Sequence, residues 1–264
     1  NYPAGATLCS APPCRAPDYY QMCYGIGYQV YPERPNPDSL SYELKEKYFS
    51  TIYNAGRDII LQNKNEYGDI ITRPTDRREN YVKRCVGLPG QTLQIKNRII
   101  YLDGKANKEP DNVQYSYYVK LKQRIPEELM EELGISMEDL TSLNTAGYLP
   151  LTKHAVAVLS QRKDIVESIT INSDTSDTDI YPLNGNMHWT RDNYGPIWIP
   201  AKGKSIDLNL DNLAIYERPI RVYEKNDLKV KDGRIYINGK EAKSYTFKMD
   251  YYWMMGDNRH NSAD

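Results

Sequence analysis

The chain has 264 residues, enough to bury the core of one large domain or two small ones. Its formal net charge is −1 and its basic residues are scattered, so the sequence shows no nucleic-acid-binding patch. No apolar run approaches the roughly 18 residues of a membrane span, and no signal peptide is evident. Because residue 1 is Asn rather than Met, we expect any membrane anchor or export signal to lie upstream of this sequence.

Tyrosine and cysteine are used unusually. Tyrosine outnumbers phenylalanine by 24 to 2, which suits half-hydrated β surfaces and peptide-binding grooves, although drift in composition explains the excess as well. Cys9, Cys14, Cys23 and Cys85 match no zinc-ligand spacing. A disulfide between Cys9 and Cys14 is one interpretation and free buried thiols are the other, while Cys85 is expected simply to pack.

The first predicted segment, residues 1–67, is irregular at its start and helical later. Residues 1–37 are rich in Pro, Gly and Cys, which predicts loops with short extended pieces. Over residues 39–62 apolar side chains recur at helical spacing, with Asp38 and Ser39 as candidate N-caps. Gly56 weakens this helix prediction, because glycine is a poor helix former.

A β pattern follows over residues 68–110. Strands are predicted at 81–86, 92–96 and 98–102, and a Pro-Gly pair at 89–90 predicts a type II turn because glycine supplies the positive φ. A resemblance between residues 95–105 and 230–240 predicts two strand–turn–strand units that end in Asp-Gly or Asn-Gly. Chance similarity between generic hairpins is the simpler interpretation of the resemblance between these two segments.

Residues 111–225 have a different pattern and predict an α+β insertion. On either side lie the two parts of a β core, residues 68–110 and 226–264. The last strand, 245–255, is the clearest, because its apolar residues alternate without a break. The fold class is therefore predicted to be mainly β with a large insertion. Helices inside the insertion are predicted at 126–133, 136–143 and 152–166, and residues 205–223 have helical spacing that is broken by Pro219.

Lys83 is the first residue that indicates chemistry. On the predicted strand it shares a face with Tyr81 and Cys85, neither of which is strongly polar. A lysine can take the proton of a serine hydroxyl only when it is neutral, so burial must lower its pKa from about 10.4 towards about 7–8. Taken alone the signal is weak, because lysines on strands are usually solvated.

A second polar segment closes the chain directly after the last predicted strand. It contains Gly256, which lets another side chain approach the backbone closely. Together with residues 81–90 it resembles bacterial type I signal peptidases, the membrane-anchored Ser/Lys enzymes that remove signal peptides from exported proteins. Residues 81–90 are similar to the family's lysine segment almost throughout, and residues 256–264 match its Gly-Asp-Asn-Arg-x-x-Ser-x-Asp pattern.

The resemblance implies a role for each matched residue. Lys83 would be the general base. Ser262 would form a hydrogen bond with the amine of Lys83 and orient it. Arg84 would pair with Asp257 under the site, and Gly256 would leave room beside the lysine. The remaining residues implied to support the closing loop are Asn258, Arg259 and Asp264.

The sequence departs from the family's pattern at the end of the chain. His260 stands where many members have aspartate, and a solvated loop residue is the plain interpretation. The sequence also stops at Asp264, before the Ser-Arg with which the family usually continues.

The nucleophilic serine is the larger departure. In the family it precedes the lysine in a Ser-Met context, so we expect it upstream of Asn1. Ser136 and Met137 imitate the motif, but with Asp139 they predict a helix cap. The serines before Lys83, none of which has that context, are Ser10, Ser39, Ser41 and Ser50.

The resemblance therefore implies a serine endopeptidase of the bacterial inner membrane, with this domain on the periplasmic side. It would bind the signal peptides of exported preproteins and use no cofactor or metal, and the chain alone would be inactive. Two other hypotheses remain: a different Ser/Lys peptidase such as a self-cleaving repressor, and a non-catalytic peptide-binding or scaffold protein. A Ser-Met motif after an upstream membrane span would favour the signal peptidase.

Overall fold

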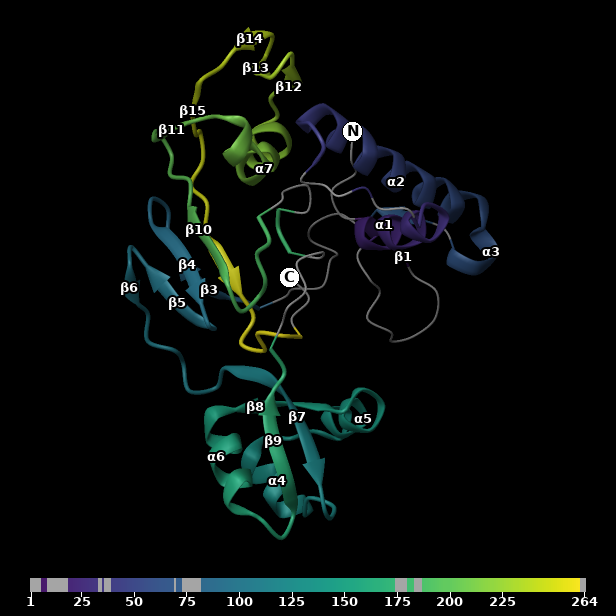
Figure 1. Cartoon of the computed structure of the whole chain (residues 1–264), viewed down its shortest axis with the longest axis vertical. Helices are drawn as coiled ribbons and strands as arrows, with labels where there is room; N and C mark the ends of the chain where they lie inside the picture. The colour runs from purple at the N-terminus through teal and green to yellow at the C-terminus, as the bar shows by residue number, and fades with distance from the viewer. Residues whose placement is uncertain are drawn as a thin grey trace. The chain divides into compact units, whose positions relative to one another are not determined.

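The computed structural model contains both helices and antiparallel strands, so the protein is mixed α/β (Figure 1). The chain forms two compact units. Unit 1 comprises residues 1–81, 184–186 and 208–243, and unit 2 comprises residues 82–183, 187–207 and 244–264. The structure describes residues 6–8, 19–32, 35, 39–68, 70–72, 82–173, 180–182 and 187–261.

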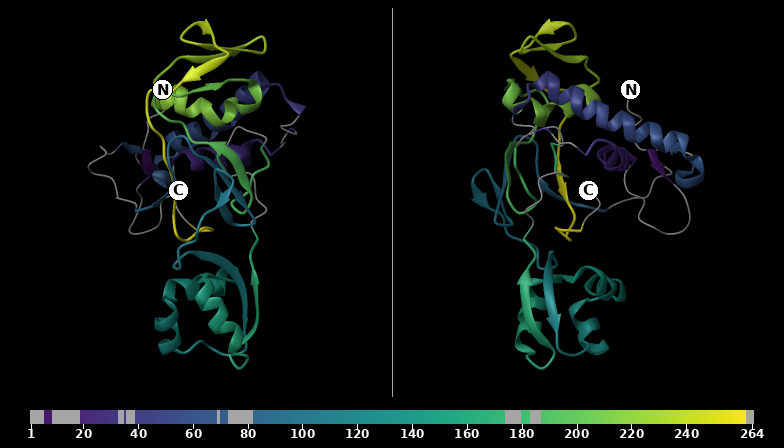
Figure 2. Two further views of the ribbon diagram at one scale, coloured as in Figure 1. Left: turned by 90° about the vertical axis from the view of Figure 1, so that its left-hand side faces the viewer. Right: turned by 45° about the vertical axis from the view of Figure 1, so that its right-hand side comes forward.

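Two helices of unit 1, α1 (Tyr19–Val30) and α2 (Tyr42–Gln62), pack against each other at very short range (Figure 2). Their contact residues recur every four positions: Tyr19 and Cys23 on α1 are buried, and Gly27 faces Ile52 of α2. A Cβ atom built on Gly56 would lie 1.8 Å from the carbonyl oxygen of Cys23. The glycine that weakened the helix prediction is therefore where the two helices touch.

The helix α1 shows that the prediction of loops throughout residues 1–37 was wrong. Its buried stripe consists of tyrosine, cysteine and glycine rather than large aliphatic residues, so no apolar periodicity marks it. The cap of α2 was also misplaced: the hydroxyl of Ser41 accepts the amide of Leu44, and the helix starts at Tyr42. Asp38 lies outside the described residues.

The rest of unit 1 combines short elements. The 4-residue helix α3 (Lys64–Tyr67) follows α2, and β1 (Ala6–Leu8) pairs with β2 (Ile70–Thr72). Further along, α7 (Leu210–Arg218) continues into a π-helical turn, η3 (Pro219–Tyr223). The helix predicted at 205–223 thus begins later than expected, because Asn209 and Asn212 form a capping box that starts α7.

The two similar segments, residues 95–105 and 230–240, each lie in a three-stranded meander, and the two meanders have matching hydrogen bonds. In unit 2, Asp103 accepts the amide of Thr92 at 2.8 Å, and in unit 1 Asn238 accepts the amide of Asp227 at 2.9 Å at the equivalent positions. Every connecting turn has two residues with positive φ, the geometry preferred in tight hairpins. The strands are β4 (Thr92–Lys96), β5 (Ile99–Leu102) and β6 (Lys105–Ala106), and β12 (Leu228–Lys231), β13 (Arg234–Ile237) and β14 (Lys240–Glu241).

The long strand predicted at 245–255 is interrupted. β15 (Ser244–Thr246) pairs with β11 (Ser205–Asp207), and β16 (Trp253–Met255) pairs with β3 (Arg84–Gly87). Between them Lys202 donates its amide to Asp250. Tyr245 and Phe247 are buried while their neighbours are exposed. Buried and exposed residues therefore still alternate beyond Thr246, where the strand pairing of β15 ends.

Another part of unit 2 holds a separate hydrophobic core, built on the sheet β8–β7–β9 with three helices beside it. The predicted cap is confirmed, since Ser136 and Asp139 form a capping box. The helix predicted at 152–166 ends at Gln161, and Val166 belongs to a strand instead. The elements are β7 (Gln114–Leu121), α4 (Glu127–Leu133), α5 (Met137–Ala146), β8 (Tyr148–Thr152), α6 (Lys153–Gln161) and β9 (Val166–Ile171); β10 (Tyr194–Trp198) pairs with β4.

Residues 208–243, which the sequence pattern divides between the insertion and the second part of the β core, belong here to the same unit as the N-terminal helices.

Candidate functional site

The two motif segments lie side by side in unit 2. β3 and β16 pair antiparallel, with Met255 opposite Arg84 and Met254 opposite Cys85. The turn that follows β3 is closed by a bond from the amide of Gln91 to the carbonyl of Leu88, with φ of +87° at Gly90. Segments about 170 residues apart in sequence therefore form one structural feature.

Arg84 and Asp257 join these segments by a two-pronged ion pair. Nε of Arg84 donates to Oδ1 of Asp257 at 2.9 Å and Nη2 donates to Oδ2 at 2.7 Å, so the pairing that the resemblance implies is present. The hydrogen bonds from Arg84 hold the pKa of Asp257 below its ordinary value, and the pKa of Arg84 is raised in turn. Because both side chains are partly exposed, we expect the pair to fix geometry more than to add stability.

The Arg84–Asp257 pair predicts a pH dependence. Since the folded pKa of Asp257 is lowered from 3.8, its contribution is complete above that value and is lost as the pH falls through the folded pKa. The stability difference between wild type and Asp257→Asn should therefore be small but constant above about pH 5 and should shrink below about pH 4. Urea unfolding at several pH values measures it; a difference that grows on acidification would contradict the assignment.

Backbone bonds hold the closing loop against the first residues of β7. The amide of Gln114 donates to the carbonyl of Asp257 at 2.8 Å, and the amide of Arg259 donates to the carbonyl of Gln114 at 2.9 Å. Within the loop, Asn258 accepts the amide of Asn261 at 3.2 Å through its side chain. Gly256, at the start of the loop, is buried. The loop is thus held on two sides, by β3 and by β7.

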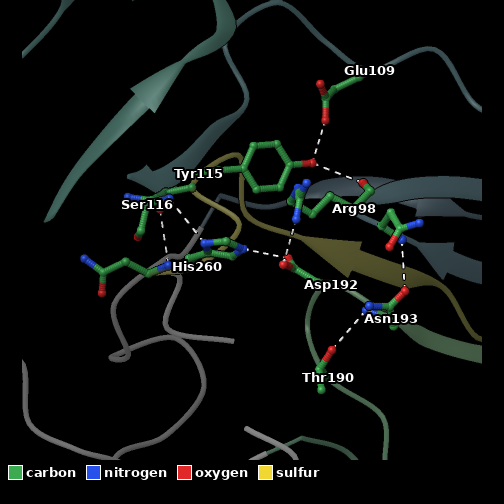
Figure 3. A network of polar contacts seen from close by, with 11 residues as sticks. Arg98, Glu109, Tyr115, Ser116, Thr190, Asp192, Asn193 and His260 are labelled. Carbon is green, nitrogen blue, oxygen red and sulfur yellow. Dashed lines mark hydrogen bonds and ion pairs between the residues drawn. The ribbon is translucent and has the colours of Figure 1, made fainter. Parts of the chain in front are cut away.

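His260 is not the solvated loop residue that the sequence suggested, because its side chain is only 6% exposed (Figure 3). Nδ1 accepts the amide of Ser116 at 3.2 Å, which leaves Nε2 to donate to the carboxylate of Asp192 at 2.8 Å. This assignment of the ring proton follows from the hydrogen-bond geometry. Asp192 also pairs with Arg98 at 3.0 Å, and Tyr115 packs edge-on against the imidazole.

Sequence reasoning missed these partners of His260. Ser116 contributes a backbone amide, which leaves no trace in the choice of side chain. Asp192 lies 68 residues from His260, in a polar stretch without periodicity. The single signal in the sequence was the departure at position 260, where histidine stands in place of the aspartate of the family's pattern.

Lys83 immediately precedes β3 and is half-buried. Its surroundings differ from the expected apolar face, since Cys85 is exposed and is a free thiol rather than a packed one. The preceding residue, Val82, is 94% exposed. The other expected site residues, Tyr81, Ser262 and Asp264, lie outside the described residues, and so do Cys9 and Cys14.

In the described part of the chain, no group of three His, Cys, Asp or Glu side chains could hold a metal ion. None of the helices in that part combines the length and the apolar character needed to cross a membrane.

Comparison with known proteins finds similarity to one family, over the part of the chain that includes β3. Residues 37–164 match the family described as signal peptidase, peptidase S26. Signal peptidase I of Bacillus caldolyticus is 38% identical over 60 residues, covering 20% of this chain and 33% of the relative. Signal peptidase I of Bacillus amyloliquefaciens is 31% identical over 84 residues, covering 32% and 38%, and signal peptidase IB of Staphylococcus aureus is 34% identical over 58 residues, covering 22% and 29%.

These matches are local. The chain spans about a third of the length of the curated relatives it matches. No solved structure matches it. The family match includes the whole of β3 and the residues around Lys83, and the relatives share one activity in their names. Residues 37–164 are thus similar to the signal peptidase family, peptidase S26, and the relatives that resemble parts of this chain are bacterial type I signal peptidases.

Proposed function

We propose that this chain is the extracytoplasmic part of a type I signal peptidase that cleaves exported preproteins with a serine and Lys83. One observation carries the proposal: β3 and β16 bring the two motif segments together, and Arg84 and Asp257 lock them by a two-pronged ion pair. Lys83 directly precedes this lock, so its position relative to the closing loop is fixed by β pairing. The family match includes the same residue.

The proposed chemistry needs no metal. The serine oxygen attacks the carbonyl carbon of the scissile peptide bond, while the neutral amine of Lys83 takes the hydroxyl proton. That proton then passes to the leaving amine, and an ester acyl-enzyme remains. A water molecule, deprotonated by the same lysine, attacks the ester and releases the carboxylate product and the free serine. Ser262 accepts a hydrogen bond from the amine and keeps it oriented.

The nucleophilic serine is proposed to lie in a segment upstream of Asn1, beside a membrane anchor. The support is the serine inventory: before Lys83 no serine has the Ser-Met context, and Ser136 is engaged as a helix cap. The catalytic core is proposed to be mainly β and signal-peptidase-like, with residues 111–225 as an insertion between its two parts. The substrate would bind as an extended strand on the periplasmic side of the inner membrane.

Cleavage of a preprotein by the protein that carries the upstream segment tests the proposal. We expect a single cut after a small residue at the end of the signal peptide. A preprotein with a large aromatic residue at that position should be cut at least about tenfold more slowly, because the proposed preference for a small residue requires a site too small for an aromatic ring. Equal cutting of the two preproteins, or no cutting of either, would refute the assignment and favour a peptide-binding role.

A further inference from the structure

A cavity of about 420 Å³ opens beside β3 in unit 2. Cationic side chains dominate its polar lining: Arg84, Arg98, Lys108, Lys153 and Arg259 contribute to it, against one acidic residue, Glu109. Lys83 is not among the lining residues. The cavity draws on both motif segments, since Arg84 lies on β3 and Arg259 on the closing loop.

Three of the five cations already have anionic partners. Arg84 pairs with Asp257, Arg98 with Asp192, and Lys153 with Glu109. Lys108 and Arg259 have no ion-pair partner within the described ranges, so the cavity carries an excess of two positive charges. A concave wall with an uncompensated charge of one sign attracts a ligand of the opposite sign.

Of Lys108 and Arg259, Arg259 gives the stronger indication of an anionic ligand. Its Nε and Nη1 atoms are buried, and neither has a hydrogen-bond partner among the residues that the structure describes. Leaving a buried charged donor unsatisfied is costly, so folded proteins rarely keep one without a use. Its charge helps to lower the pKa of Asp257, yet no hydrogen bond joins the two side chains. An incoming oxygen acceptor would relieve this deficit after a small rotation of the guanidinium.

The apolar lining sets the other half of the specificity. Val86, Ile99 and Pro110 contribute to the wall, and the volume falls in the range of small-molecule sites. We propose that the cavity binds a small organic anion, with a phosphate or carboxylate group towards Arg259 and Lys108 and a compact apolar body against Val86, Ile99 and Pro110. Such a ligand would connect β3, the closing loop and the segment around residue 108, and would stabilise unit 2 when bound.

Titration of the 264-residue chain with phenyl phosphate and with benzoate, followed by amide chemical shifts, tests this proposal. We expect saturable shifts concentrated at residues 84–86, 98–100 and 107–109 for at least one probe. The probe that binds more tightly identifies the preferred anionic group. Inorganic phosphate should bind more weakly than phenyl phosphate, because it lacks the apolar body.

Substitutions of single basic residues distinguish binding in the cavity from attraction by general surface charge. Lys108→Gln should weaken binding about three- to tenfold, whereas Lys105→Gln, which removes the same charge from an exposed strand outside the lining, should not change it. Arg259→Gln should abolish saturation in a folded protein; should that variant fail to fold, the Lys108 and Lys105 pair still decides. Equal weakening by both lysine variants, or no saturable shift with either organic probe, would overturn the proposal.

Discussion

If the proposed function holds, replacing Lys83 with methionine will reduce preprotein cleavage at least about 10³-fold in the proposed longer protein, while the fold is retained. Methionine keeps most of the length and packing of the side chain but cannot take a proton from the serine. The residue is only half-buried and lies before β3 rather than inside it, so its loss should leave the β3–β16 pairing intact. Single-turnover cleavage measured beside circular dichroism gives both values.

A matched control distinguishes the base from any other lysine. Lys105→Met makes the same chemical change on the exposed strand β6 and should leave cleavage within about twofold of wild type. If Lys83→Met cleaved preprotein at the wild-type rate, the proposed Ser/Lys assignment would fail, even though the similarity of residues 37–164 to signal peptidases would remain. If both variants lost activity together, the loss would reflect surface charge rather than catalysis.

Replacing Gly56 with alanine will destabilise unit 1 by about 1–3 kcal/mol or more, despite the higher helix propensity of alanine. The added Cβ would lie 1.8 Å from the carbonyl oxygen of Cys23 and 2.8 Å from the amide nitrogen of Gly27, so the two helices must move apart. Separation would expose the buried contacts of Cys23 and Ile60. Denaturant unfolding measures the loss.

Gly25 offers the matched control for this substitution. It lies on the same helix as Gly27, but a Cβ built there meets nothing within 4 Å. Gly25→Ala should therefore stabilise the protein by about 0.5–1 kcal/mol through helix propensity alone. A Gly56→Ala variant as stable as Gly25→Ala would show that the helices do not pack through this glycine.

Local signals in the sequence predicted local structure well. The pair at Pro89–Gly90 forms the expected turn, and Ser136 with Asp139 forms the expected cap. Both depend on neighbouring residues alone, so the sequence contains the whole cause. The helix 19–30 escaped prediction because its stability comes from a glycine contact with α2, 29 residues further along for Gly27 and Gly56.

In the candidate site, too, one feature was predicted from the sequence and another was not. The Arg84–Asp257 pair was expected because family motifs place both residues, although 173 positions separate them. The burial of His260 was not expected, because it depends on Asp192 and on a backbone amide at Ser116. Side-chain patterns carry no record of backbone partners, and no motif included Asp192.

Because β7 holds the closing loop by main-chain bonds, substitutions in the first residues of β7 should affect the loop less than insertions or deletions there. Gln114 and Ser116 hold the loop through main-chain atoms, which almost any residue could supply. Homologous chains could therefore vary in sequence at the half-buried Gln114, whereas Ser116, only 3% exposed, leaves room for small side chains alone. At both positions, inserting or deleting one residue would reverse which groups face the loop. Any shortened version of the protein must preserve the count of residues from Val113 to Ser116, whatever is removed beyond them.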